Sequence, residues 1–230
     1  MKGIPYASAV GSLMYAHVCI RLDIGFVVGL LGRYQSNPGL DHWKAAKKVL
    51  QYLQGTKDYR LTYRHTDRLE VVCYSDSDFV GFVDTKKSTS VYIFLLARGA
   101  ISWRSYKQTI VAMSTMEAKF IACCKATTEA LWLRNFLSGL KIVDLVERPL
   151  QIFCDSTTAV FFSKNNKCSS RSKYIDIKYL SVRESIKRNE VFIECISAEL
   201  MIVDPMPKGL PLLQFKGHVD NMGLVNLFYV

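Results

Sequence analysis

Three aspartates stand where carboxylates could meet and do chemistry. Asp76 ends a strand-like run at residues 73–76, Asp155 ends another at residues 152–155, and Asp204 lies in the last helical segment, after the fifth expected strand. Adjacent central strands would bring the first two together, and clustered carboxylates repel one another unless a cation neutralises them. The positions therefore indicate a divalent-metal site for phosphoryl chemistry. The alternative is that aspartates at strand ends serve as ordinary turn and cap residues.

The elements that would position these acids begin near residue 67. Strand patterns at 69–74, 89–96 and 100–112 predict an antiparallel meander, because they are rich in β-branched and aromatic residues. A long helix, capped by Thr115, is expected at 115–137. The later expected elements are a strand at 149–154, helices at 156–163 and 175–188, a strand at 190–196 and a helical stretch at 200–208. This order predicts an α/β fold with a mixed sheet and helices on both faces.

The first 66 residues have a different, helical pattern. Asp41 is expected to cap a helix that ends at Gly55, because apolar residues follow it at helical spacing. Residues 7–34 are apolar and rich in small residues, interrupted by Asp23 and several glycines, which predicts two short packed helices. No catalytic signature occurs there. The sequence thus divides into a helical segment (1–66), an α/β domain (67–210) and a C-terminal tail (211–230).

The composition excludes several classes of protein. Half of the 230 residues are apolar, which rules out intrinsic disorder. No apolar run approaches the ~20 residues of a membrane span, so no membrane partner is expected. The seven cysteines are odd in number and lack C-x-x-C spacing, and the four histidines are scattered. We therefore expect reduced, buried thiols in an intracellular protein, and no zinc site.

The positive charge gives a clue to partners. Thirty Lys and Arg against twenty Asp and Glu leave a net charge of +10, which favours a polyanion such as nucleic acid. The charge is densest in residues 164–188, and a smaller basic group (Lys86, Lys87, Arg104 and Lys107) lies near the first three strands. The candidate nucleic-acid-binding residues are Lys164, Lys167, Arg171, Lys173 and Lys178. They would contact phosphates without reading sequence, and the alternative is a solvated basic surface.

Several short motifs occur in a fixed order along the chain. They are Tyr74-Ser-Asp-Ser-Asp-Phe-Val-Gly81, Thr85-Lys-Lys-Ser-Thr-Ser90, Ile101-Ser-Trp-Arg-Ser105, Ser114-Thr-Met-Glu-Ala-Lys-Phe-Ile-Ala122, Ala130-Leu-Trp-Leu-Arg134, Cys154-Asp155 and Lys173-Tyr-Ile-Asp-Ile-Lys178. Together they closely resemble the ribonuclease H region that ends the Pol polyprotein of plant copia-type retrotransposons. The similarity covers nearly the whole chain, and residues 1–66 resemble the segment that joins the reverse transcriptase to that region. No Tyr-x-Asp-Asp polymerase motif is present, so the upstream reverse transcriptase centre is absent from this chain.

The resemblance implies a ribonuclease H-like mixed five-stranded sheet and a specific reaction. Four acids would hold two Mg²⁺ ions beside the scissile phosphate of the RNA strand in an RNA–DNA hybrid. The RNA strand would be selected through its 2′-hydroxyl groups. By motif, Asp76, Asp155 and Asp204 match the first, third and fourth acids. Asp78 is also usual in the family, and we expect it to be a surface or secondary residue.

The second acid is where the chain departs from the family pattern, Ser-Thr-x-Glu-Ala-Glu-aromatic-x-Ala. This chain has Glu117 and Lys119, which lie about 200° apart around a helix, so only one of them can face the metals. The family places Ala three residues after the catalytic Glu, and Ala122 stands three residues after Lys119. We therefore predict that Lys119 occupies the catalytic position. Glu117 remains the alternative metal ligand.

Other departures from the family point in the same direction. Tyr174 replaces a usual His, Val91 replaces a usual Gly, and Pro205 and Pro207 interrupt the segment after Asp204. They suggest a decaying copy of the element. Two functions follow as hypotheses: a Mg²⁺-dependent hybrid ribonuclease impaired by Lys119, or an inactive ribonuclease H-like module that binds nucleic acid.

Overall fold

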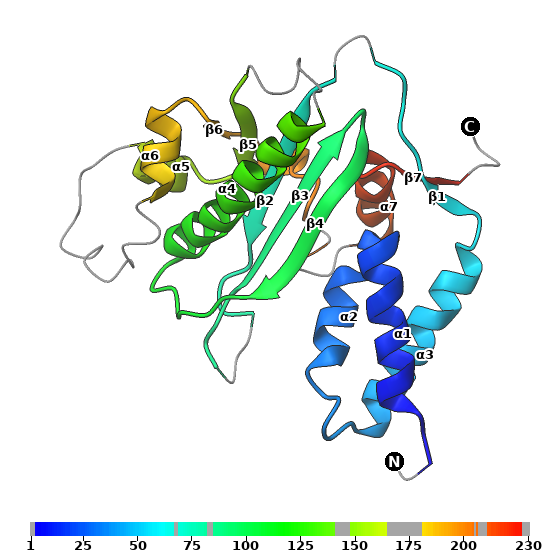
Figure 1. Ribbon diagram of the computed structural model, residues 1–230. Helices are drawn as coiled ribbons and strands as arrows, with labels where there is room; N and C mark the ends of the chain where they lie inside the picture. Colours follow the sequence, from blue (N-terminus) through cyan, green and yellow to red (C-terminus); the bar gives the residue numbers. More distant parts are fainter. Residues whose placement is uncertain are drawn as a thin grey trace.

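A five-stranded sheet in the order β4-β3-β2-β5-β6 forms the centre of the fold (Figure 1). The computed structural model describes residues 3–66, 69–81, 85–140, 148–164, 181–204, 206 and 211–226. The strands are β2 (Val71–Ser77), β3 (Thr89–Leu96), β4 (Gly99–Lys107), β5 (Leu150–Cys154) and β6 (Val191–Cys195). The first three form an antiparallel meander, and β5 and β6 run parallel to β2. The predicted ribonuclease H-like mixed five-stranded sheet is confirmed.

Helices cover both faces of this sheet, as predicted. Residues from α4 (Thr115–Gly139), α5 (Thr157–Lys164) and α6 (Ser181–Lys187) share one buried cluster with β2, β3, β5 and β6. The opposite face packs against Met201, Val203 and Met206, which follow the short helix η5 (Ala198–Leu200), and against α7 (Leu212–Asn221). Strand β3 shows why both faces must be covered. Tyr92 and Phe94 enter the first cluster, while Val91, Ile93 and Leu95 enter the second.

The N-terminal helices form a separate cluster beside β4 (Figure 1). They are α1 (Tyr6–Cys19), η1 (Leu22–Ile24), α2 (Gly25–Gly32) and α3 (Leu40–Gly55). Indole Nε1 of Trp103 in β4 donates to the carbonyl oxygen of His17 at 3.0 Å and links the two parts. The N-cap of α3 is Gly39, not Asp41 as predicted. Asp41 lies in the first turn instead, where a negative charge favours the helix dipole.

The C-terminal residues pack into the fold. Strand β7 (Leu224–Asn226) pairs antiparallel with β1 (Tyr59–Leu61), which lies in the predicted helical segment. Val219, Met222 and Leu224 are buried in the second core cluster. Gly223 has φ +88°, and a Cβ there would lie 2.8 Å from Gly99 Cα, so this close approach of two backbones requires glycine. The described part of the predicted tail is therefore part of the core.

Two boundaries differ from the sequence-based expectation. Strand β4 ends at Lys107 because Thr89, its cross-strand partner, is the first residue of β3. The helical stretch expected at 200–208 is wrong for its described part, because residues 202–204 form a turn after η5. Pro205 disfavours helical geometry at the residue before it, which explains the turn. Among the described helices, none has the length and apolarity needed to cross a membrane.

Candidate active site

The sheet brings Asp76 and Asp155 together. Strands β2 and β5 are parallel, with Tyr74 opposite Phe153. Continuing this register by two residues places Asp76 level with Asp155, which directly follows β5. Asp76 is only 2% exposed. Because adjacent parallel strands fix the two backbones, the carboxylates share one place at the carboxyl ends of β2 and β5.

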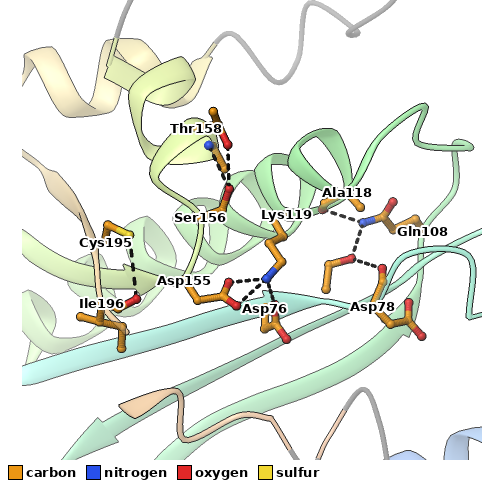
Figure 2. Close-up of polar contacts among 12 residues, drawn as sticks. Asp76, Asp78, Gln108, Ala118, Lys119, Asp155, Ser156, Thr158, Cys195 and Ile196 are labelled. Carbon is orange, nitrogen blue, oxygen red and sulfur yellow. Dashed lines mark hydrogen bonds and ion pairs between the residues drawn. The ribbon is translucent and has the colours of Figure 1, made fainter. Parts of the chain in front are cut away.

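Helix α4 places Lys119 above this pair. The Nζ atom of Lys119 lies 3.2 Å from Asp76 Oδ1 and donates to both carboxylate oxygens of Asp155 at 2.5 Å (Figure 2). The amine comes from the helix and the two acids come from neighbouring strands. One ammonium group therefore occupies the space between two carboxylates.

The electrostatics of the three groups follow from their burial. Burial raises the pKa of Asp76; Lys119 opposes this shift, while Asp155 reinforces it. Burial alone would lower the pKa of Lys119, but the two carboxylates outweigh it, so the pKa of the amine is raised. Lys119 is consequently protonated at neutral pH. With all three groups ionised, the cluster carries one uncompensated negative charge.

Glu117 takes part in the start of α4. Its backbone N–H donates to Oγ of Ser114, the N-cap residue, at 3.2 Å. Its carboxylate Oε2 accepts the backbone N–H of Met113 at 2.8 Å. This arrangement resembles a capping box, in which an acid three residues after the cap reaches back to a free N–H. Ser114 rather than the predicted Thr115 is the cap, and Glu117 is held away from Asp76 by its bond to Met113.

Asp204 lies in the turn that replaces the expected helix. Its backbone N–H donates to Met201 O at 3.2 Å, and one carboxylate oxygen is buried. Among the described residues, no group of three or more His, Cys, Asp or Glu side chains is arranged to hold a metal ion. The donor set also does not fit Mg²⁺ at Asp76 and Asp155, because the ammonium of Lys119 already contacts both carboxylates and supplies no ligand.

Asp78 and Gln108 hold the strands around the site. Asp78 Oδ1 accepts the backbone N–H of Thr89, and burial raises the pKa of this carboxyl. Gln108 is 1% exposed, and its Nε2 donates to Ala118 O at 2.9 Å (Figure 2). It also donates to two serine hydroxyls, Ser77 Oγ at 3.2 Å and Ser90 Oγ at 2.8 Å. The sequence pattern did not single out Gln108, because a glutamine beyond a strand carries no signal of burial.

The relatives of this sequence identify its family. No protein-family model matches the chain. It is 39% identical over 216 residues to the retrovirus-related Pol polyprotein from transposon TNT 1-94 of Nicotiana tabacum, covering 94% of this chain and 16% of that polyprotein. The chain belongs to the retrovirus-related Pol polyproteins of plant transposons. It spans about one sixth of the length of that Pol relative.

Two further similarities extend beyond the Pol polyproteins. Secreted RxLR effector protein 161 of Plasmopara viticola is 46% identical over 133 residues, covering 58% of this chain and 94% of the effector. The crystal structure of LC11-RNase H1 in complex with RNA/DNA hybrid is 15% identical, covers 57% of this Pol chain and 88% of that chain, and has a TM-score of 0.41. The fold assignment for this Pol chain therefore rests on its own strand order and pairing.

Of the five candidate nucleic-acid-binding residues in this Pol chain, the structure describes Lys164. Lys164 ends α5, and its Nζ lies 4.4 Å from the centroid of the Phe192 ring. Such a cation–π contact fixes the amine beside β6. The other candidates, Lys167, Arg171, Lys173 and Lys178, lie outside the described residues, as does Tyr174.

Proposed function

We propose that this chain is a ribonuclease H-like module of a copia-type Pol polyprotein that binds RNA–DNA hybrids and whose hydrolysis of the RNA strand is impaired. The observation that carries the proposal is the position of the Lys119 amine between Asp76 and Asp155. The relatives support the Pol assignment, and the net charge of +10 supports a nucleic-acid partner.

The charge of Lys119 explains the impairment. A divalent metal at this position would activate water and stabilise the leaving oxygen. The carboxylates of Asp76 and Asp155 have the chemistry to bind such an ion, but both already contact the ammonium of Lys119. Two unit charges 4 Å apart interact by about 4 kcal/mol at an effective dielectric near 20. Replacing an acid with a lysine turns that attraction into repulsion of similar size.

A fully active ribonuclease would need Glu117 to replace the missing acid. Glu117 would then have to release the backbone N–H of Met113 and give up its part in the start of α4. Losing such a helix-start contact costs about 1 kcal/mol. Glu117 also leaves the helix about 200° away from Lys119, so it points away from the position that the metal ligand would need. The observed contacts favour the impaired module.

Cleavage of a labelled hybrid tests the proposal. We expect no Mg²⁺-dependent cleavage by the unaltered protein, and a gain of cleavage in Lys119→Glu, which restores the family acid. Lys119→Gln is the matched control, because it removes the positive charge without adding an acid, and we expect it to stay inactive. Adding Asp155→Asn to Lys119→Glu should abolish the gain. Robust Mg²⁺-dependent cleavage by the unaltered protein would contradict the proposal.

A further inference from the structure

An open groove of about 420 Å³ runs between strand β4 and helix α4. Helix α4 packs over β2 and β3, and β4 is the edge strand of the sheet (Figure 1). The side of β4 that faces the helix is therefore only partly covered. Tyr92, which is buried, and Ile121 of α4 form part of the floor.

Cations from three separate parts of the chain gather at this groove. Arg104 and Lys107 come from β4 and Lys125 comes from α4, and all three are exposed. A fourth cation, Lys87, donates its Nζ hydrogen to the carbonyl oxygen of Thr109, which also lines the groove, at 2.5 Å. Because 18 or more residues separate Lys125 from the others in sequence, the charge of this groove is created by the fold.

Among the described residues that line the groove, the single acid is Glu129, and it bonds to the protein itself. Glu129 Oε1 accepts the hydroxyl hydrogen of Ser102 at 3.1 Å, and Glu129 is half-buried. The guanidinium of Arg104 lies 5.8 Å from the centroid of the Tyr106 ring, which lines the same groove. The rim of the groove is therefore positively charged.

We propose that this groove binds the phosphate backbone of a nucleic acid. The proposal rests on the proposed function, since it gives the hybrid-binding module a contact region besides residues 164–178. Arg104 and Lys107 both line the groove, and their backbone positions are about 10 Å apart along the strand, which is longer than the reach of a single phosphate. Exposed cations along an open groove suit a chain of phosphates, held without sequence readout, better than a single enclosed anion.

The groove adjoins the candidate active site. Gln108 lines the groove, and its Nε2 donates to Ala118 O, in the residue before Lys119 (Figure 2). A backbone lying along β4 therefore passes the first turns of α4. This places the bound strand beside the helix that carries Lys119.

Salt-dependent binding tests the groove directly. A fluorescently labelled RNA–DNA hybrid is titrated with each protein, without Mg²⁺, at several KCl concentrations. The groove variant is Arg104→Gln/Lys107→Gln/Lys125→Gln. The matched control is Lys47→Gln/Lys48→Gln/Lys57→Gln, which removes the same charge from exposed positions in and after α3. Thermal unfolding of each protein confirms that the variants are folded.

The expected result is a change in the slope of log affinity against log salt. Each phosphate contact contributes about 0.9 to the magnitude of that slope. The slope of the groove variant should therefore be smaller in magnitude by about 2 to 3, and the control should keep the slope of the unaltered protein. An unchanged slope in the groove variant would overturn the proposal. If the unaltered protein binds no hybrid at low salt, the binding part of the proposed function fails and the groove fails with it. Cleavage by the unaltered protein would overturn only the impairment.

Discussion

Two buried ion clusters in this molecule differ in their ratio of cations to carboxylates. In the helical unit, Arg21 donates to both carboxylate oxygens of Asp23, at 3.0 and 2.6 Å, and Tyr52 donates to the same carboxylate at 2.7 Å. In the sheet, one amine serves two carboxylates, Asp76 and Asp155. The first cluster is balanced in charge, and the second is not.

This difference separates a structural ion pair from an altered site. The Arg21–Asp23 pair has geometric complementarity, because a guanidinium and a carboxylate match in two parallel bonds. A balanced, fully bonded pair needs no further ligand. The sheet cluster keeps two acids at neighbouring strand ends, where burial raises the pKa of Asp76 even with Lys119 present. The cluster consists of two neighbouring carboxylates, Asp76 and Asp155, with a single cation, Lys119, supplied by helix α4.

The largest expected effect comes from breaking the balanced pair. Asp23→Ala leaves the Arg21 guanidinium buried without its partner, and we expect a loss of about 3 to 5 kcal/mol in the free energy of unfolding. Asp41→Ala is the control, because its pair with Lys44 is exposed, and with its favourable place at the start of α3 it should cost less than about 1 kcal/mol. Urea unfolding measures both. Equal losses in the two variants would contradict the structural role of Asp23.

Lys119→Met in the unbalanced cluster should make the free energy of unfolding depend on pH. Two neighbouring carboxylates without a cation destabilise the folded state, by about 2 to 3 kcal/mol at neutral pH. Burial already raises the pKa of Asp76 and Lys119 opposes that rise, so removing the amine raises the pKa of Asp76 further. The folded state then binds more protons than the unfolded state, and stability recovers as the pH falls toward the unfolded pKa. Lys125→Met, on the exposed side of α4, is the control. Denaturant unfolding between pH 7 and pH 5 measures the effect, and a pH-independent loss would contradict it.

A smaller effect is expected where the helix is tied to the sheet. Gln108→Leu removes the bond to Ala118 O and two bonds to serine hydroxyls, leaving buried polar groups without partners. We expect a loss of about 1 to 3 kcal/mol. Gln151→Leu is a matched control, because Gln151 makes an exposed bond to Glu194, and it should cost less than about 0.5 kcal/mol. A loss in Gln108→Leu no larger than in the control would show that Gln108 does not tie α4 to the sheet.

The local patterns predicted the strands that carry the site. Strand β3 coincides with the predicted run, and Asp76 and Asp155 stand at strand ends as the sequence indicated. These features depend on residues that are close together in the sequence, so the local sequence pattern is enough to predict them. The spacing of Ala122 distinguished Lys119 from Glu117, and the structure shows the amine of Lys119 beside the two aspartates.

The features that the sequence did not predict depend on distant contacts. The pairing of Tyr59–Leu61 with Leu224–Asn226 joins two three-residue strands, which are too short to show a period. The Arg21–Asp23 network also depends on α3, because Tyr52 and Thr56 supply two of its bonds. In its described part, the helix expected at 200–208 is replaced by a turn, because Pro205 disfavours helical geometry at Asp204. The groove between β4 and α4 could not be predicted from local patterns, because it depends on the position of β4 at the edge of the sheet.

Metal titration tests the central claim, that the Lys119 ammonium takes the place of a metal between Asp76 and Asp155. Isothermal calorimetry with Mg²⁺, and with Mn²⁺ as a second probe, compares the unaltered protein with Lys119→Glu. The account predicts no saturable binding in the unaltered protein and saturable binding in Lys119→Glu that disappears when Asp155→Asn is added. Saturable Mg²⁺ binding by the unaltered protein that is lost in its Asp155→Asn variant would contradict the account.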